Sequence, residues 1–299
     1  MSHWTTARVV VVWLRMRRLI DSVGLQSSIF AAVALVFSLI SSAGIVLADH
    51  SWSKYHWDLS TAETLENQLK LGDNVSSMWD GSLSAASVDW NASVIKNAVV
   101  AGTSNANCDP TLERVEVCNG SYGENGWLGI AQIWVYRGKD GHIAQAIVKL
   151  NETYFALPAY DTLAWKQFVM CQEVGHAFGL DHQDENFNNS NLGSCMDYTN
   201  DPDGSFFGQL NNEHPNQHDY DMLQSIYAHL NETSTGGPGG GSGKGGGKGK
   251  PALPVEAKRA LAGPAEWGLA IAQDAHGRNS LYVRNLGNVS VYTHVLWAQ

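Results

Sequence analysis

A short stretch, residues 163–182, constrains the fold more than any other part of the chain. Five side chains in it recur at intervals of three and four residues, which predicts a helix that places them on one face: Trp165, Phe168, Val169, Gln172 and His176. Gly179 is suited to end that helix in a left-handed turn. The chain can then fold back, which brings His182 near His176.

The residues of this helix and turn suit a metal ion. Gln172 and His176 lie one helical turn apart and project the same way, so both can touch one ion. His182 returns to the same ion after Gly179. Zinc prefers nitrogen donors with one position left open, where it activates water, and the neighbouring carboxylate of Glu173 is the expected general base.

The segment Gln172-Glu173-x-x-His176-x-x-Gly179-x-x-His182 resembles the motif of the metzincin metallopeptidases, His-Glu-x-x-His-x-x-Gly-x-x-His. Met196 looks like the methionine turn of that family. Tyr198 holds the place of the tyrosine that approaches zinc in astacin-like and serralysin-like members. The sequence 128–131 resembles the matrixin edge strand, on which substrate adds as a further strand. The resemblance covers about residues 126–230.

The resemblance implies an α+β domain in which a twisted mixed sheet packs on the active-site helix. It further implies a zinc endopeptidase that takes a protein or peptide substrate. We expect the protein to be secreted and to be a monomer. Glu173 would be the general base, and Tyr198 would steady the oxyanion.

Gln172 departs from the motif, because the family has a zinc-binding histidine there. Its amide oxygen is a weaker donor to zinc than imidazole. Three interpretations are open: Gln172 binds a weaker but working zinc; Tyr198, Asp181 or Asp184 completes the site; or the site is inactive. The last would make the protein a zincin-shaped binding or adhesion module.

The N-terminus predicts export. Three arginines precede an apolar run over 29–48 that ends Val-Leu-Ala, which favours a signal peptide over residues 1–48 cleaved after Ala48. The alternative is an uncleaved anchor, because about 20 apolar residues can span a bilayer. In either case the rest of the chain faces outside, and a membrane is a partner only if the segment is uncleaved.

Four cysteines fit an oxidising location. Cys108 and Cys118 are spaced for a closed surface loop, which leaves Cys171 and Cys195 as the second pair, although four cysteines allow three pairings. A Cys171–Cys195 disulfide would tie the metal-bearing helix to the methionine turn; two buried thiols are the alternative.

Charge excludes one class of partner. Residues 49–235 hold 8 basic and 25 acidic residues, so no basic stripe is available for nucleic acid. Oxygen-rich loops at 181–188 and 201–204 are candidates for calcium or simply solvated acidic loops. His214 and His218 lie one helical turn apart and could bind a metal ion, but such a pair is more often found at the surface without a metal.

The chain divides by composition. The metzincin-like domain is expected over 49–232, a Gly/Ser/Lys linker over 233–250, and a small β-rich module over 251–299. Three strands are expected in the module, which docks on the main domain or binds something separately. In the main domain we expect a helix opened by a capping box at 60–63 and running through Leu69, a strand at 87–90, a hairpin of 129–136 with 142–150, and a last helix from about residue 215.

Overall fold

The computed structural model describes residues 55–59, 68–138, 140–228 and 251–299. Contacts within the chain separate residues 1–48 from a second compact unit, residues 49–299. The expected export segment, the capping box at 60–63 and the Gly-rich linker lie outside the described residues. Among the described helices, none combines the length and apolar character that crossing a membrane would need.

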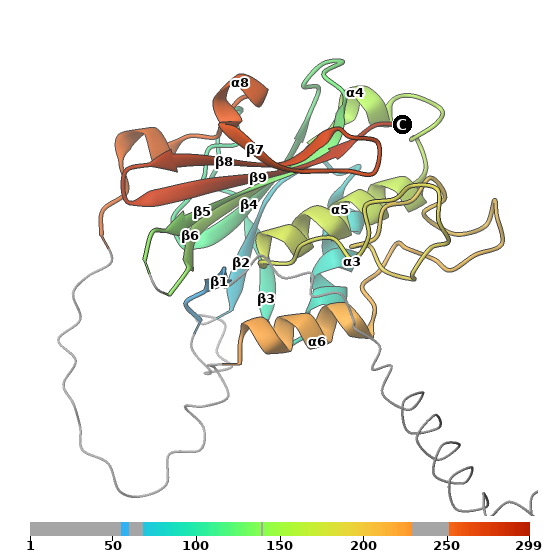
Figure 1. Ribbon diagram of the computed structural model, residues 1–299, viewed down its shortest axis with the longest axis horizontal. Coiled ribbons are helices and arrows are strands. Elements are labelled where there is room, and N and C mark those ends of the chain that lie inside the picture. Colours follow the sequence, from blue (N-terminus) through green and yellow to red (C-terminus); the bar gives the residue numbers. More distant parts are fainter. Residues whose placement is uncertain (1–54, 60–67, 139, 229–250) are drawn as a thin grey trace, which may run out of the picture. The chain divides into compact units, whose positions relative to one another are not determined.

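The second unit is built on one mixed sheet of nine strands (Figure 1). Their order is β3-β2-β4-β6-β5-β9-β8-β7, and β1 pairs with β6. Pairing is parallel from β3 to β6 and antiparallel from β6 to β7. The strands are β1 (His56–Trp57), β2 (Leu69–Asn74), β3 (Asn97–Ala101), β4 (Arg114–Gly120), β5 (Trp127–Tyr136), β6 (His142–Asn151), β7 (Leu269–Gln273), β8 (Asn279–Leu286) and β9 (Val289–Trp297). This large mixed sheet with few helices is compatible with the expected α+β class.

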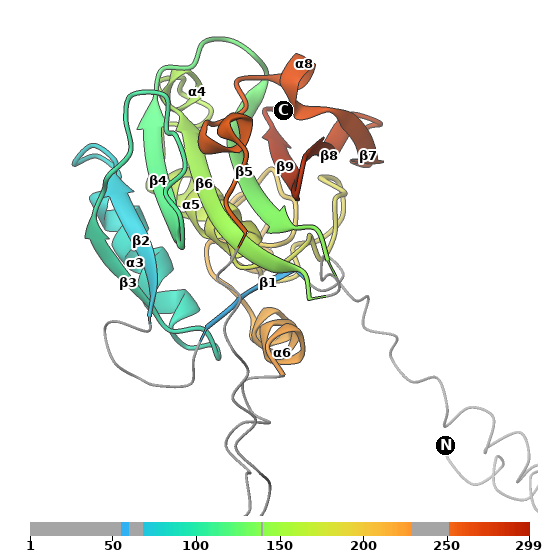
Figure 2. The same ribbon diagram turned by 90° about the vertical axis from the view of Figure 1, so that its left-hand side faces the viewer.

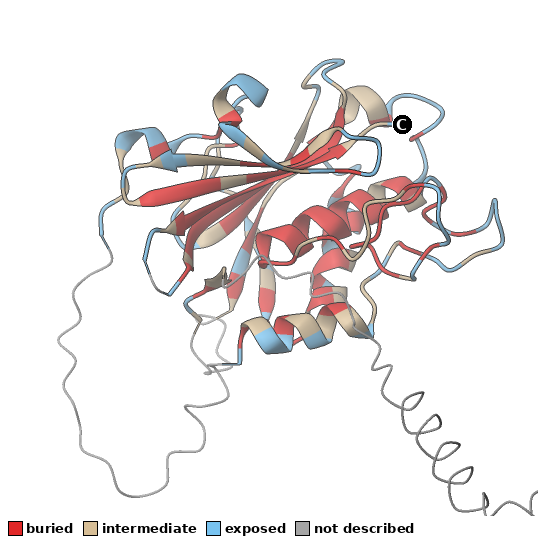
Figure 3. Cartoon of the chain, viewed as in Figure 1, coloured by how far each residue is buried: buried red, intermediate tan, exposed pale blue. Residues whose placement is uncertain are grey.

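Helices cover one face of the sheet. They are α3 (Asp80–Trp90), α4 (Glu152–Phe155), α5 (Leu163–Ala177) and α6 (Gln217–Ile226). The central one, α5, contacts β5, β6 and β9, and from residue 167 to its end every residue is buried (Figure 3). Thr162 caps it by accepting a hydrogen bond from the backbone N–H of Trp165. Gly179 follows with φ +103°, so the expected turn is confirmed.

The opposite face carries a second core, and residues after the linker cover it. The short helices η3 (Val255–Lys258) and α8 (Pro264–Trp267) lie there (Figure 2). Two buried glutamines of the central strands hold this segment: Gln132 exchanges two hydrogen bonds with the backbone of Leu261, and Gln145 donates to Ala257 O. The three strands expected in 251–299 are present, and β9 pairs with β5 from Trp127–Trp297 to Tyr136–Val289. This segment therefore extends the sheet of the main domain.

Three local expectations were wrong. Residues 87–90 end helix α3 instead of forming a strand, because Ser82, Leu83, Ala86, Ser87 and Trp90 are buried at helical spacing. Leu69 opens strand β2 rather than continuing a helix. The segment 128–131 is not at an edge, because β5 lies between β6 and β9.

Candidate metal centre

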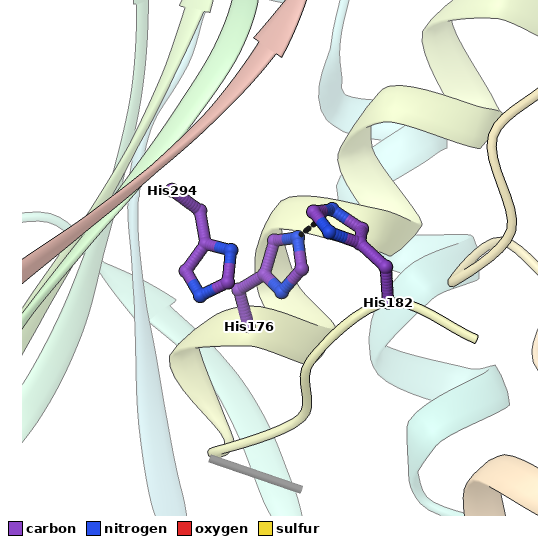
Figure 4. Close-up of side chains that lie close together, drawn as sticks. All are labelled: His176, His182 and His294. Carbon is purple, nitrogen blue, oxygen red and sulfur yellow. Dashed lines mark hydrogen bonds between the residues drawn. The ribbon is translucent and has the colours of Figure 1, made fainter. Parts of the chain in front are cut away.

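Helix α5 and the turn after it bring His176 and His182 together, as expected. Their Nε2 atoms lie 2.8 Å apart (Figure 4). The other ring nitrogen of each is already engaged: His176 Nδ1 lies 2.9 Å from Leu180 O, and His182 Nδ1 lies 2.6 Å from Glu185 Oε1. These second contacts fix the orientation of both rings, as in many histidine–metal sites.

The two Nε2 atoms are placed where they could share a cation. In the tautomers in which each Nδ1 donates to its oxygen partner, both Nε2 atoms present lone pairs. Two lone pairs 2.8 Å apart repel unless a proton or a metal ion lies between them. Two nitrogens on one tetrahedral zinc ion are about 3.3 Å apart, so a small widening of this pair accommodates the ion.

A third histidine, His294, joins the pair from strand β9 (Figure 4). Its ring stacks on His176 with centroids 3.9 Å apart and lies 5.4 Å from the ring of His182. One potential ligand atom from each of the three residues lies within 4.8 Å of the others. Burial, and then the two other histidines, hold the pKa of His294 well below its ordinary value, so its ring is the neutral form that binds metals. Because a ring nitrogen binds in the ring plane, the stacked ring must turn to share an ion with His176.

Glu173 lies between α5 and β5. A Cβ on Gly129 of β5 would come within 2.6 Å of Glu173 Oε1, so glycine leaves the room that this carboxylate occupies. The side chain is fully buried, and neither carboxylate oxygen has a hydrogen-bond partner among the described residues. Burial raises the pKa of Glu173 well above its ordinary value. A buried carboxyl group in this state is suited to accept or hold a proton.

Gln172 is engaged elsewhere. Its Nε2 donates a 2.9 Å hydrogen bond to Cys195 O, which attaches α5 to the segment after His182. Its Oε1 is buried and has no hydrogen-bond partner in the described part of the chain. The assignment of Gln172 as a zinc ligand stays a prediction. His294 is an additional candidate for the third ligand.

The methionine segment lies against α5. Met196 is fully buried, and a Cβ on Gly175 would come within 2.5 Å of its Sδ. The Cys171–Cys195 disulfide joins the helix to this segment, and Cys108–Cys118 closes the expected loop, so both pairings are confirmed.

Tyr198 packs edge-on against His182, with ring centroids 4.4 Å apart. Its hydroxyl donates to Val295 O of β9 over 3.4 Å. Burial, then nearby carboxylates, raises the pKa of Tyr198 well above its ordinary value, so the hydroxyl keeps its proton. In this arrangement it contacts the last strand rather than open space.

The acidic loops take supporting positions. Asp181 and Glu185 lie on the Nδ1 side of His182, away from His176. Asp184 accepts from the backbone N–H of Asn186, and Asp201 accepts from those of Phe206 and Phe207. Calcium at these loops stays a prediction. His214 is exposed and pairs with Asp89 of α3, which fits a surface role.

The three histidines are buried, and strand β9 covers them on the side of the sheet. His176, His182 and His294 expose 1 %, 8 % and 1 % of their surface. Strand β9 occupies the free side of β5, where the sequence predicted that substrate would add. A pocket of about 580 Å³ lies on the other side and is lined by Phe187, Asn188, Asn189, Ser190, Asn200, Phe207 and Gln209. Phe187 packs on Tyr198, whose ring contacts His182, so two aromatic rings lie between this pocket and the histidines.

His294 is the site residue that the sequence interpretation missed. The signal was weak but present: a single histidine interrupts the largely apolar strand 289–297, in a chain whose main motif lacks one imidazole. Alternation along β9 places Tyr292, His294 and Leu296 on the face that α5 covers. In comparisons with known proteins, no family model and no curated protein matches the chain.

Proposed function

We propose that the protein is a secreted zinc-dependent metallopeptidase of the metzincin type, with His176, His182 and His294 as the metal ligands and Glu173 as the general base. The observation that carries this proposal is the cluster of three buried imidazoles whose ligand atoms lie within 4.8 Å of one another. Three imidazoles with one open position form a common catalytic zinc site. Glu173 lies on the same helix, three residues before His176.

The chemistry follows from the side chains. A zinc ion held by the three histidines would polarise the peptide carbonyl and lower the pKa of the attacking water. The carboxylate of Glu173 takes the proton of that water and passes it to the leaving amine. Packing around Glu173 keeps competing water away, which strengthens its electrostatic interaction with the reacting atoms.

The pocket beside Phe187 is the candidate place for substrate on the loop side, and Phe187 and Tyr198 would have to move for substrate to reach the histidines. Both sides of β5 are already paired, so a peptide cannot add to that strand without displacing β9. The pocket is lined by amides, one hydroxyl and two phenyl rings, and no charged side chain lines it. We therefore expect uncharged polar substrate side chains there.

One observation favours the alternative, a zincin-shaped binding protein without catalysis. All three histidines are at least nine-tenths buried, and β9 covers the strand that resembles a substrate-binding edge. In that case the metal stabilises the fold by tying β9 to α5.

A casein or gelatin assay distinguishes the two. We expect zinc-loaded protein to cleave, zinc-stripped protein to be inactive, and Glu173→Gln to lose at least about a hundredfold in rate, the size expected for general-base catalysis. Glu124→Gln, an exposed carboxylate, is the matched control. Zinc-loaded wild type that cleaves nothing while binding one zinc would support the binding protein.

A further inference from the structure

A second pocket opens on the face of the sheet opposite the histidines. It has a volume of about 460 Å³ and is lined by Ala106, Asn107, Asp109, Tyr122, Lys149, Arg259, Ala260 and Ala262. The main domain and the segment after the linker both contribute to it. Asp109 joins the two by accepting the backbone N–H of Ala260 over 3.0 Å.

Lys149 is a buried residue of the central strand β6. It belongs to β6, opposite Cys118 of β4 and Ile130 of β5, and only 6 % of its surface is exposed. Successive residues of a strand point to opposite faces of the sheet. Val148 and Leu150 face α5, so the side chain of Lys149 points to the second core. Lysine is almost never this buried without a partner.

The ammonium group of Lys149 lacks acceptors. It has three donors, yet no described residue accepts a hydrogen bond from it. Its Nζ lies over the ring of Tyr122, 5.5 Å from the centroid, in a cation–π contact. Burial lowers the pKa of Lys149 to about 8, against the opposing influence of Asp109. The ring of Tyr122 and the charge of Asp109 therefore offset only part of the cost of this buried amine, and no described residue supplies a hydrogen-bond acceptor.

The remaining lining suits an anion. Arg259 adds a second cation, although two hydrogen bonds engage it with Glu266. Asn107 and Tyr122 offer neutral donors. Asp109 is the one acidic side chain of the lining, and each of its oxygens already accepts a hydrogen bond, from Asn105 and from Ala260. A cationic ligand would face Lys149 and Arg259, and an uncharged ligand would leave the ammonium group uncompensated.

We propose that this pocket binds a small oxyanion, a carboxylate or phosphate group, which accepts hydrogen bonds from the Lys149 ammonium group. The site is separate from the histidine cluster, since Lys149 and His294 lie on opposite faces of the sheet. Ligand binding here also joins the main domain to residues 259–262, because both parts line the pocket.

Calorimetric titration of the full chain tests the proposal. The probes are inorganic phosphate and sulfate in one arm and acetate and succinate in the other, at constant ionic strength set with chloride. We expect one arm or both to bind with a dissociation constant of millimolar or tighter, and Lys149→Met to weaken binding at least about tenfold, since a charge-assisted hydrogen bond is lost. The arm that binds more tightly identifies phosphate or carboxylate as the ligand group.

Lys70→Met, an exposed lysine of β2, is the control and should bind as the wild type does. Zinc content of Lys149→Met should be unchanged. If Lys149→Met does not fold, reductive methylation of wild type with mass spectrometry replaces it: phosphate or succinate should protect Lys149 and no other lysine. The proposal is overturned if no oxyanion binds more tightly than chloride, if Lys149→Met binds as wild type does, or if Lys149 is unprotected.

Discussion

The imidazole of His294 stacks on that of His176, with ring centroids 3.9 Å apart, although a Gly-rich linker separates their segments in the sequence. This contact changes how the motif on α5 is interpreted. A helix that lacks one expected imidazole receives another from the last strand. The candidate centre is therefore assembled from the middle of the unit and from its last strand.

Glu185 is predicted to raise metal affinity without binding the metal. It accepts from His182 Nδ1 and from Ser280 Oγ of β8, so it holds the ligand ring in place. We expect Glu185→Gln to weaken zinc binding about 10–100-fold, the usual cost of losing such a partner. Competition with a chromogenic chelator measures this, with Glu124→Gln as the control. If Glu185→Gln binds zinc as tightly as the wild type does, Glu185 does not support the His182 ligand.

Gly129 is predicted to be irreplaceable at its position on β5. An added Cβ would lie 2.6 Å from Glu173 Oε1 and 2.7 Å from Val169 Cγ1, so Gly129→Ala must displace one of them. We expect a loss of about 1–3 kcal/mol in the free energy of unfolding, together with reduced activity. Gly138→Ala is the control, because nothing lies within 4 Å of its Cβ. Equal denaturation midpoints for the two variants would contradict this packing.

Cutting the linker is predicted to leave the molecule assembled. Strand β9 pairs with β5 along its length, and Gln132 and Gln145 hold residues 257–261 on the second core. We expect a chain cleaved at a protease site inserted between residues 240 and 245 to elute as one complex and to keep its zinc. Separation of the fragments in size-exclusion chromatography without denaturant would show that residues 251–299 are an independent module.

Asp197 is predicted to make the fold less stable as the pH rises through mild acid. Burial raises its pKa to about 6, above the ordinary value of 3.8, so the folded state holds the proton more tightly than the unfolded state. The free energy of unfolding should therefore fall between about pH 4 and 6, by about 2 kcal/mol. Urea denaturation of zinc-free protein at several pH values measures this.

Asp197→Asn should flatten that part of the profile, because no titrating group remains at the position. Asp221→Asn, an exposed carboxylate of α6, should leave the profile as in the wild type. An unchanged slope in Asp197→Asn would contradict the assignment.

The elements that could be predicted from the sequence are those with strong local signals. Helix α5 and the β5–β6 hairpin combine regular apolar spacing with clear ends, and Gly179 supplied the turn. Helix α3 was missed because its Ser- and Ala-rich sequence has no pronounced apolar face. The strands β2, β3 and β4 were missed because they pair in parallel, across long connections, and no hairpin pattern marks the partner of a parallel strand.

Some residues of the candidate site could be predicted from local sequence, and others could not. His176, His182, Gly179 and Met196 are close in sequence, so helical spacing and the turn predicted their proximity. The position of His294 depends on the pairing of β9 with β5, a long-range contact that no local pattern encodes. The role of Gln172 depends on the same contact. If His294 supplies the third metal ligand, the Gln172 amide is not needed as a ligand.

Zinc content by mass spectrometry, together with affinity for zinc, tests the central claim most directly. Wild type should bind one zinc ion per chain. Gln172→Ala should do the same, because the three histidines supply the ligands in this account. His294→Ala should lose at least about a hundredfold in affinity, more than loss of a supporting residue costs. His276→Ala, an exposed histidine of the same segment, is the control. Full zinc affinity in His294→Ala, with loss in Gln172→Ala, would contradict the account.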